Sequence, residues 1–192
     1  ILFGIASGIA LVIGSVLGVF WDPSDRVMGA LLAFAGGALV TAAAYELIER
    51  AFQTGGQWLV AGSLMAGAVL FAGADFAFKQ FTPGEGESGW SLLASVTLDG
   101  VPENAALGIV LLGSSGAGLA LVAAFVASNV PQALSGTRNM LDDDYGTWTT
   151  FAGWCIVAVI VGGSVWAGNV LFAGTGMAVL AGLRGFAGGA IL

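Results

Sequence analysis

Carboxylate, amide and hydroxyl side chains occur at two places inside long apolar stretches, and each group surrounds a proline. These residues are Asp99, Pro102 and Glu103 in the first group, and Ser128, Asn129, Pro131 and Gln132 in the second. A proline inside a helix removes one backbone hydrogen bond. An ionisable side chain at membrane depth costs at least about 2.5 kcal/mol and usually faces protein or a wet cavity. The two groups therefore indicate a polar site inside a helical membrane protein.

The first group has the chemistry of a cation site. Asp99 and Glu103 are four residues apart, so they share one helical face, and Pro102 leaves the carbonyl of Leu98 without its helical donor. Two carboxylates and a carbonyl form an oxygen environment suited to a divalent cation. The alternative is a kinked helix whose acids bond to neighbouring helices. We favour the functional site because two acids this close in lipid require a cation, a proton or a donor.

The second group is neutral. Aligning the two prolines matches Ser128 with Asp99, Asn129 with Gly100, and Gln132 with Glu103. The neutral groups either supply oxygen ligands without adding negative charge or bridge helices. Beside the first group they are candidates for a second wall of the same site.

Other charged residues lie in other apolar stretches. Glu46 and Glu49 are three residues apart on one face, and Arg50 next to Glu49 favours an ion pair for the latter. Glu46 lies further from the end of its stretch, so it is a candidate third carboxylate of the cavity, with a purely local role as the alternative. Arg184 has no evident partner in the sequence.

The composition is that of a membrane protein. Hydrophobic residues make up 57% of the chain and charged residues 9%, the mean hydropathy is +0.94, and soluble domains carry roughly 25% charged residues. The 32 glycines show no period of three, which favours closely packed membrane helices over collagen.

Several function classes are disfavoured by what the sequence lacks. One cysteine and no histidine leave no disulfide framework, no cysteine-based metal site and no histidine-based catalysis. A net charge of −7 with a single lysine disfavours nucleic-acid partners. No nucleophile elbow or phosphate-binding glycine loop is present, so we expect neither an enzyme nor an organic cofactor.

Apolar stretches of about 20 residues predict an all-α membrane bundle in a single domain, residues 1–192. Seven stretches qualify: 1–20, 27–48, 58–80, 90–112, 117–140, 148–171 and 175–192. Three basic residues, Arg26, Lys79 and Arg138, fall on one side and Arg50 on the other, so the positive-inside bias predicts an N-terminus outside the cell. Four tryptophans fall at predicted span ends, as in an interfacial belt, whereas Trp154 and Trp166 lie deeper and are interpreted as packing residues.

A short segment occurs twice. Phe34–Leu39 in the second stretch is nearly repeated as Phe186–Ile191 in the seventh, and those stretches cross the bilayer in opposite directions. Similar segments in opposite orientation are typical of inverted-repeat transporters; chance agreement in a chain rich in glycine and alanine is the alternative. If the repeat holds, an eighth span follows Leu192 and the chain ends within its seventh span.

The two proline segments resemble the hallmark of the ZIP (zinc/iron permease) metal transporters. That family has a fourth span of the form His-Asn-x-Pro-Glu-Gly and a fifth of the form Gln/Glu-Asn/Asp-x-Pro-Glu-Gly, and residues 99–104 and 128–133 are similar in order and spacing. Residues 32–52 are similar to the second span of prokaryotic members. The resemblance implies eight spans in a 3+2+3 arrangement with inverted outer repeats, in the cell membrane, often as a homodimer. It also implies one or two divalent cations, such as Zn²⁺, Fe²⁺ or Mn²⁺, moved by alternating access.

This chain departs from the family pattern at three positions. Asp99 replaces the usual histidine, Gly100 the asparagine, and Gln132 the second glutamate. We therefore expect at most one firmly bound cation, of harder character than zinc alone. The expected ligands are Asp99 and Glu103, completed by Asn129, Gln132, Ser128 and Glu46.

Two other functions stay open at this point. A ZIP-fold membrane protein that no longer transports, and acts as a structural or accessory subunit, would explain the missing histidine and the neutral Gln132. A proton- or sodium-coupled carrier would use Asp99 and Glu103 as a proton site.

Overall fold

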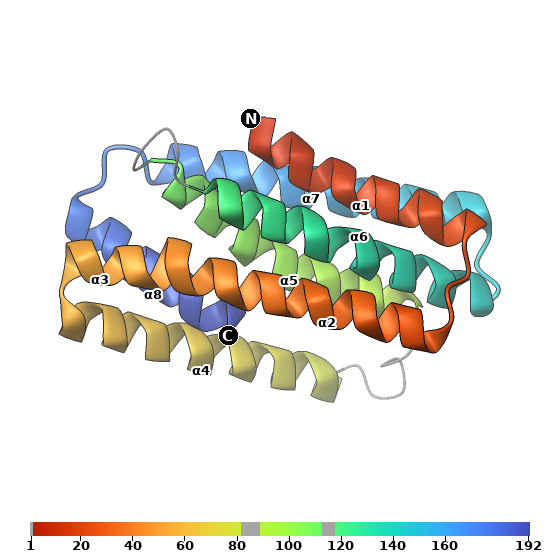
Figure 1. Cartoon of the computed structure of the whole chain (residues 1–192), viewed down its shortest axis with the longest axis horizontal. Coiled ribbons are helices and arrows are strands. Elements are labelled where there is room, and N and C mark those ends of the chain that lie inside the picture. Colours follow the sequence, from red (N-terminus) through yellow and green to blue (C-terminus); the bar gives the residue numbers. More distant parts are fainter. Residues whose placement is uncertain (1, 82–88, 113–117) are drawn as a thin grey trace.

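The computed structural model describes residues 2–81, 89–112 and 118–192, and within these ranges the chain is helical, with no strand (Figure 1). The elements are α1 (Leu2–Phe20), α2 (Asp25–Ala42), the π-helix η1 (Ala43–Glu49), α3 (Arg50–Gly55), α4 (Gln57–Phe81), α5 (Gly89–Val110), α6 (Leu119–Asp142), α7 (Thr147–Leu171) and α8 (Met177–Ile191). Because α2, η1 and α3 follow one another without a break, the described residues form seven rods. Each predicted apolar stretch is confirmed as a helix.

Several of these helices are long and apolar enough to cross a membrane. Within the described residues five runs qualify by length and composition: Leu2–Phe20, Asp25–Gly55, Gln57–Ala77, Leu119–Asp142 and Thr147–Leu171. The two remaining rods are less typical of membrane spans, for separate reasons. Helix α5 carries Asp99, Glu103 and Asn104, and α8 has 15 residues. The architecture therefore supports a membrane-embedded helical bundle.

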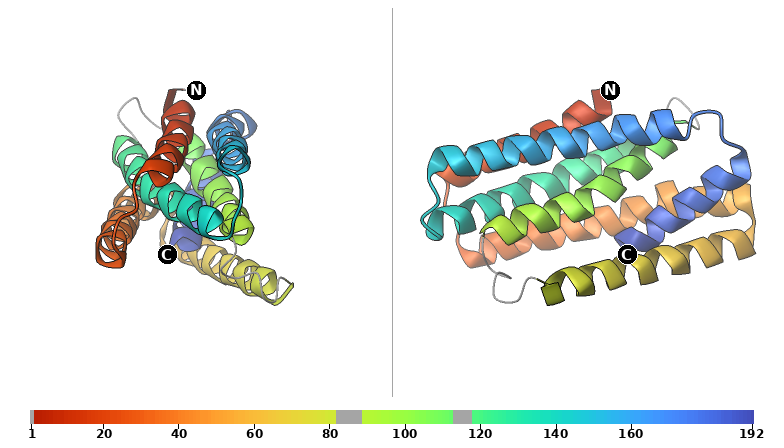
Figure 2. Two further views of the ribbon diagram at one scale, coloured as in Figure 1. Left: turned by 90° about the vertical axis from the view of Figure 1, so that its right-hand side faces the viewer. Right: turned by 180° about the vertical axis from the view of Figure 1, so that it is seen from behind.

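The rods lie side by side along one long direction, and successive rods alternate in direction (Figure 1). In the views of Figure 2, α1 and α4 lie on opposite sides of the bundle, and α8 runs beside α4. The helices α2 and α8, which carry the repeated segment, run in opposite directions (Figure 1).

Two groups of helices can be distinguished by their contacts. In one group α1 packs on α6 and α7, and α5 packs on α7 and α6; in the other, α8 packs on α4, α3 and η1. The contacts of α2 with α6 and of α8 with α5 join the two groups. The polar segments of α5 and α6 therefore both belong to the first group.

Glycines allow the closest helix crossings. A Cβ atom built at Gly162 of α7 would lie 2.7 Å from the carbonyl oxygen of Gly4 in α1. A Cβ atom built at Gly189 of α8 would overlap the backbone of Leu64 in α4. The abundant glycine predicted to bring helices together is used in this way at several crossings.

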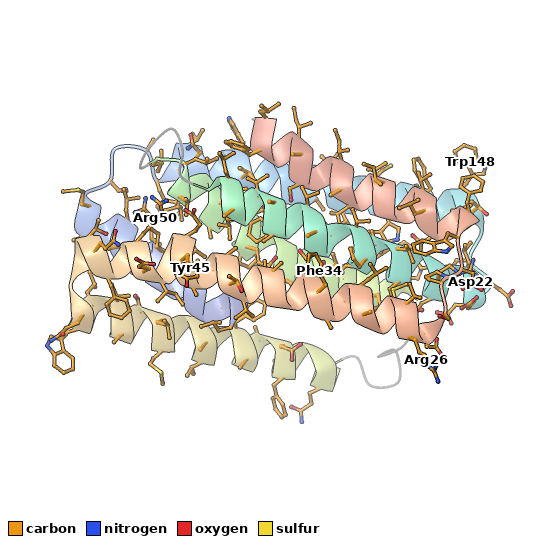
Figure 3. The ribbon with its side chains drawn as sticks, in the orientation of Figure 1. Asp22, Arg26, Phe34, Tyr45, Arg50 and Trp148 are labelled. Carbon is orange, nitrogen blue, oxygen red and sulfur yellow. The ribbon has the colours of Figure 1, made fainter. Side chains whose placement is uncertain are left out.

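The arginines Arg26, Arg50 and Arg138 are divided between the two ends of the bundle. Arg138 lies with Asp22 at one end, 3.0 Å between Nη2 and Oδ2, and Arg26 lies at the same end, whereas Arg50 lies toward the other (Figure 3). The side chain of Lys79 is outside the described residues. Arg26 and Arg138 therefore lie at one end and Arg50 toward the other, as the sequence predicted.

The tryptophans agree with the sequence expectation in all but one case. Trp58 and Trp148, near helix starts, are 84% and 83% exposed, which suits an interfacial position. Trp154 is fully buried, as expected of a packing residue. The interpretation of Trp166 as a packing residue is wrong, because this side chain is 57% exposed on the outer face of α7; depth along a helix does not determine which face a residue occupies.

Candidate functional site

Both prolines lie inside unbroken helices. Helix α5 continues through Pro102 and α6 through Pro131, although each proline removes one backbone donor. Two residues after Pro102, the side-chain Nδ2 of buried Asn104 donates to the carbonyl of Gly100 at 2.9 Å. This bond lies within α5, so it supports the segment locally.

The register between α5 and α6 follows from their shared hydrophobic cluster. Residues 106, 107 and 110 of α5 pack in one cluster with residues 121, 122 and 125 of α6, and the two helices run in opposite directions (Figure 1). One helical turn further along each contact face come Glu103 and Ser128, and a second turn further come Asp99 and Gln132. From this register we infer that the carboxylates of α5 lie level with the neutral polar groups of α6.

The carboxylates of this region lie inside the bundle. Asp99 and Glu103 are partly buried, and the charge of Asp99 acts on Glu103. Two like charges on adjacent turns repel each other, and a low-dielectric surrounding increases that repulsion. A cation or a proton between them relieves it, which is the chemistry expected from the sequence.

The predicted site residues of α6 differ in whether their hydrogen bonds stay within that helix or reach another one. The hydroxyl of Ser128 donates to the carbonyl of Phe125 at 3.1 Å, within its own helix. Nδ2 of Asn129 donates across the bundle to Ser7 of α1, to its carbonyl at 3.1 Å and its hydroxyl at 3.0 Å. Asn129 therefore joins α6 to α1. Its partner Ser7, 122 residues away, carries no sequence signal that would have identified it.

Glu46 has partners of its own. Its Oε2 lies 2.8 Å from Nε of Arg50 and accepts the backbone N–H of Gly118, at the start of α6, at 3.3 Å. The expected pairing of Arg50 with Glu49 is wrong: Glu49 instead accepts a hydrogen bond from Gln53 at 3.2 Å. An i to i+4 spacing lets Arg50 reach back to Glu46, whereas adjacent residues diverge around a helix. The partners of Glu46 are therefore Arg50 and Gly118, at the end of the bundle where α6 begins.

The donor set is small. No group of three or more aspartate, glutamate, cysteine or histidine side chains suited to a metal ion occurs within residues 2–81, 89–112 and 118–192. A cation between α5 and α6 would therefore depend on two carboxylates, with neutral oxygens from Ser128, Gln132 or the peptide backbone. Such a donor set favours a weakly bound, exchangeable ion over a structural one.

Comparisons with models of known protein families and with curated proteins found no match to this chain. The likeness to ZIP transporters therefore depends on the residues of α2, α5 and α6 themselves.

The bond between α6 and α1 gives a first prediction. We expect Asn129→Ala to lower the free energy of unfolding by about 1 kcal/mol, because it removes two hydrogen bonds and leaves buried Ser7 without its donor. Ser128→Ala is the matched control, since its hydroxyl bonds to Phe125 within α6. Unfolding in mixed micelles would measure both. Equal stability of the two variants would show that the bond to Ser7 contributes nothing.

Proposed function

We propose that this chain is a ZIP-like permease for divalent metal cations, with the cation as its transported substrate. The proposal rests on the pair Asp99 and Glu103 on α5 and on the register inferred above, which puts this pair level with Ser128 and Gln132 on α6. The pair supplies two negative charges at the middle of a helical bundle. A divalent cation neutralises both, and the neutral groups complete its oxygen shell without excess charge.

The chemistry of the donors favours particular substrates. Carboxylate, amide and hydroxyl oxygens are hard ligands, and they suit Mn²⁺ and Fe²⁺ at least as well as Zn²⁺. No imidazole is available anywhere in the chain. We therefore propose Mn²⁺ and Fe²⁺ as substrates alongside Zn²⁺.

The contact pattern supports an inverted-repeat, 3+2+3 architecture. Glycines 8 and 14 of α1 have the same spacing as glycines 162 and 168 of α7, and the prolines align α5 with α6. Ser7, just before Gly8 of α1, contacts Asn129. Val161, just before Gly162 of α7, lies against Gly100, the residue that aligns with Asn129. Equivalent contacts in two halves are what an internal repeat of opposite orientation produces.

The proposed placement is in the cell membrane, with the N-terminus outside and the end that carries Arg26 and Arg138 in the cytoplasm. In this orientation the chain crosses the membrane outward in α5 and back to the cytoplasm in α6. The acid pair then lies between the two sides, where a transported ion must pause. A homodimer remains part of the proposal through the family resemblance alone.

The test is metal uptake by proteoliposomes that contain the complete protein. We expect Glu103→Gln to reduce Mn²⁺ or Zn²⁺ uptake by about 100-fold or more, because it removes half of the negative charge in a site of low dielectric. Glu49→Gln is the matched control, since this exposed glutamate accepts a hydrogen bond from Gln53 at the surface, and metal uptake by this variant should stay within about twofold of the original. Absence of uptake of Zn²⁺, Fe²⁺, Mn²⁺ and Co²⁺ under every gradient would refute the proposal.

A second candidate function is a ZIP-fold protein that serves as an accessory subunit. It is favoured by the bonds of Asn129 to α1, which use the amide for packing, and by the neutral Gln132. This candidate predicts copurification with a stoichiometric partner and unfolding that does not respond to added metal. The permease predicts uptake by the purified chain alone.

A further inference from the structure

One arginine of the bundle is buried between helices. Arg184 of α8 is 7% exposed. It shares a helical face with Ala181 and Gly188. A Cβ atom built at Gly55 of α3 would lie against Ala181, and Gly188 lies against Ile48 of η1. Arg184 therefore faces the continuous rod formed by η1 and α3, between Ile48 and Gly55.

The charged groups nearest to Arg184 come from that rod. Arg50 and Glu46 are the charges that act on it, and they form an ion pair with each other. The one carboxylate of this cluster also accepts the N–H of Gly118. Figure 3 shows Arg50 on the side of its rod that faces α6, where Gly118 precedes the helix. The cluster Glu46, Arg50 and Arg184 therefore joins η1, α3, α8 and the start of α6.

The charges of this cluster do not balance. Two guanidinium groups face one carboxylate, and that carboxylate is already bonded to Arg50 and Gly118. None of the described residues forms a hydrogen bond or an ion pair with Arg184, and its Nε is buried without a partner. One positive charge is therefore left uncompensated.

An uncompensated guanidinium inside a membrane bundle is costly. Arg184 is seven residues after Met177, the first residue of α8, so it lies about 10 Å along that helix. Buried charges in proteins are normally paired, because desolvation without a partner costs several kcal/mol. Planar guanidinium groups are well suited to bind an anion through several N–H groups at once.

We propose that Arg184 and Arg50 form a binding site for an anion, either a small free anion or the phosphate of a lipid headgroup. The anion lies between the two guanidinium groups and supplies the missing negative charge. Glu46 is its internal competitor, because the same arginine bonds to both. The proposal stands independently of cation transport, since it uses no residue of α5.

The experiment measures thermal unfolding of the purified, complete protein in an uncharged detergent. Sodium gluconate is replaced stepwise by sodium chloride, nitrate or phosphate at constant ionic strength, and the rise in Tm gives an apparent Kd. We expect saturable stabilisation of the original protein and at least about tenfold weaker binding in Arg184→Gln. Arg138→Gln is the control, because Arg138 lies at the opposite end with Asp22, and it should keep the original response.

A second variant tests the same site in the opposite direction. Glu46→Gln removes the competing carboxylate, so we expect the anion to bind about tenfold more tightly. This arm decides the question if Arg184→Gln fails to fold.

A separate arm, in gluconate, compares nanodiscs of phosphatidylcholine with nanodiscs that contain phosphatidylglycerol. If only the phosphatidylglycerol nanodiscs stabilise the protein, and this stabilisation depends on Arg184, a lipid headgroup is the source of the anion.

The proposal is overturned if no anion and no anionic lipid stabilises the protein. It is also overturned if Arg184→Gln keeps the same response as Arg138→Gln, which would indicate a general salt effect, or if Glu46→Gln leaves the apparent Kd unchanged.

Discussion

Gly168→Ala is expected to destabilise the bundle by about 3 kcal/mol, at the upper end of the usual cost of overpacking. A Cβ atom at this position in α7 would overlap the carbonyl oxygen of Ala105 in α5 and lie 2.9 Å from both the carbonyl carbon and Cα of that residue. Backbone atoms cannot rotate away as a side chain can. The substitution must therefore push α5 and α7 apart, and the opposing Gly108, whose own Cβ would meet the backbone of α7, offers no room on the other side.

Gly163→Ala is the control on the same helix. No atom lies within 4 Å of a Cβ built at this position, and alanine has the higher helix propensity by up to about 1 kcal/mol. We therefore expect a small gain in stability at Gly163 and a large loss at Gly168. Unfolding in mixed micelles, together with size-exclusion profiles, would measure both. A change in stability at Gly168 as small as the change at Gly163 would show that the crossing of α5 and α7 is looser than the structure has it.

The helices were predictable from the sequence because one physical condition determines them. A backbone in lipid must satisfy its own hydrogen bonds, so each apolar stretch of about 20 residues forms a helix. This condition gave all seven rods, with end points close to those observed. It did not predict that the second rod continues to Gly55 through the π-helix η1, whose sequence Ala43–Glu49 carries no breaking residue.

The polar groups were harder to predict because their partners are distant in the chain or depend on local twist. Spacing within a helix correctly placed Asp99 and Glu103 on one face. The same kind of reasoning assigned Arg50 to its neighbour Glu49, although the i to i+4 partner is Glu46. The bonds of Asn129 to Ser7 depend on how α6 packs against α1, which the pattern of either helix alone does not determine.

Predicting which face of a helix is buried meets the same difficulty. Trp154 and Trp166 both lie within α7 and both are flanked by small or apolar residues. Only the packing of α7 against α1, α5 and α6 decides that the first is buried and the second is exposed. In a membrane both faces of a helix are apolar, so hydrophobic periodicity, the usual signal for a buried face, is weak.

Trp154→Ala is accordingly expected to cost about 3–5 kcal/mol of folding stability, the range for removing a large buried aromatic side chain. The ring of Trp154 is fully buried, and it packs in a cluster with residues Leu11, Leu93, Ala133, Met140, Val157 and Val161. It also fills the space beside Gly136, where a built Cβ would overlap the ring. The ring therefore joins α7 to α1, α5 and α6 at once, and lipid cannot refill the cavity left by its removal.

Trp166→Ala is the matched control, and it separates packing from membrane partitioning. Trp166 lies on the same helix and is 57% exposed, where it borders the apolar groove of about 580 Å³ between α1 and α7. Lipid or detergent replaces its contacts when it is removed, so we expect a loss below about 1 kcal/mol. Unfolding curves of the two variants in the same micelles give the comparison. Equal losses would mean that burial within the bundle adds no stability beyond contact with lipid.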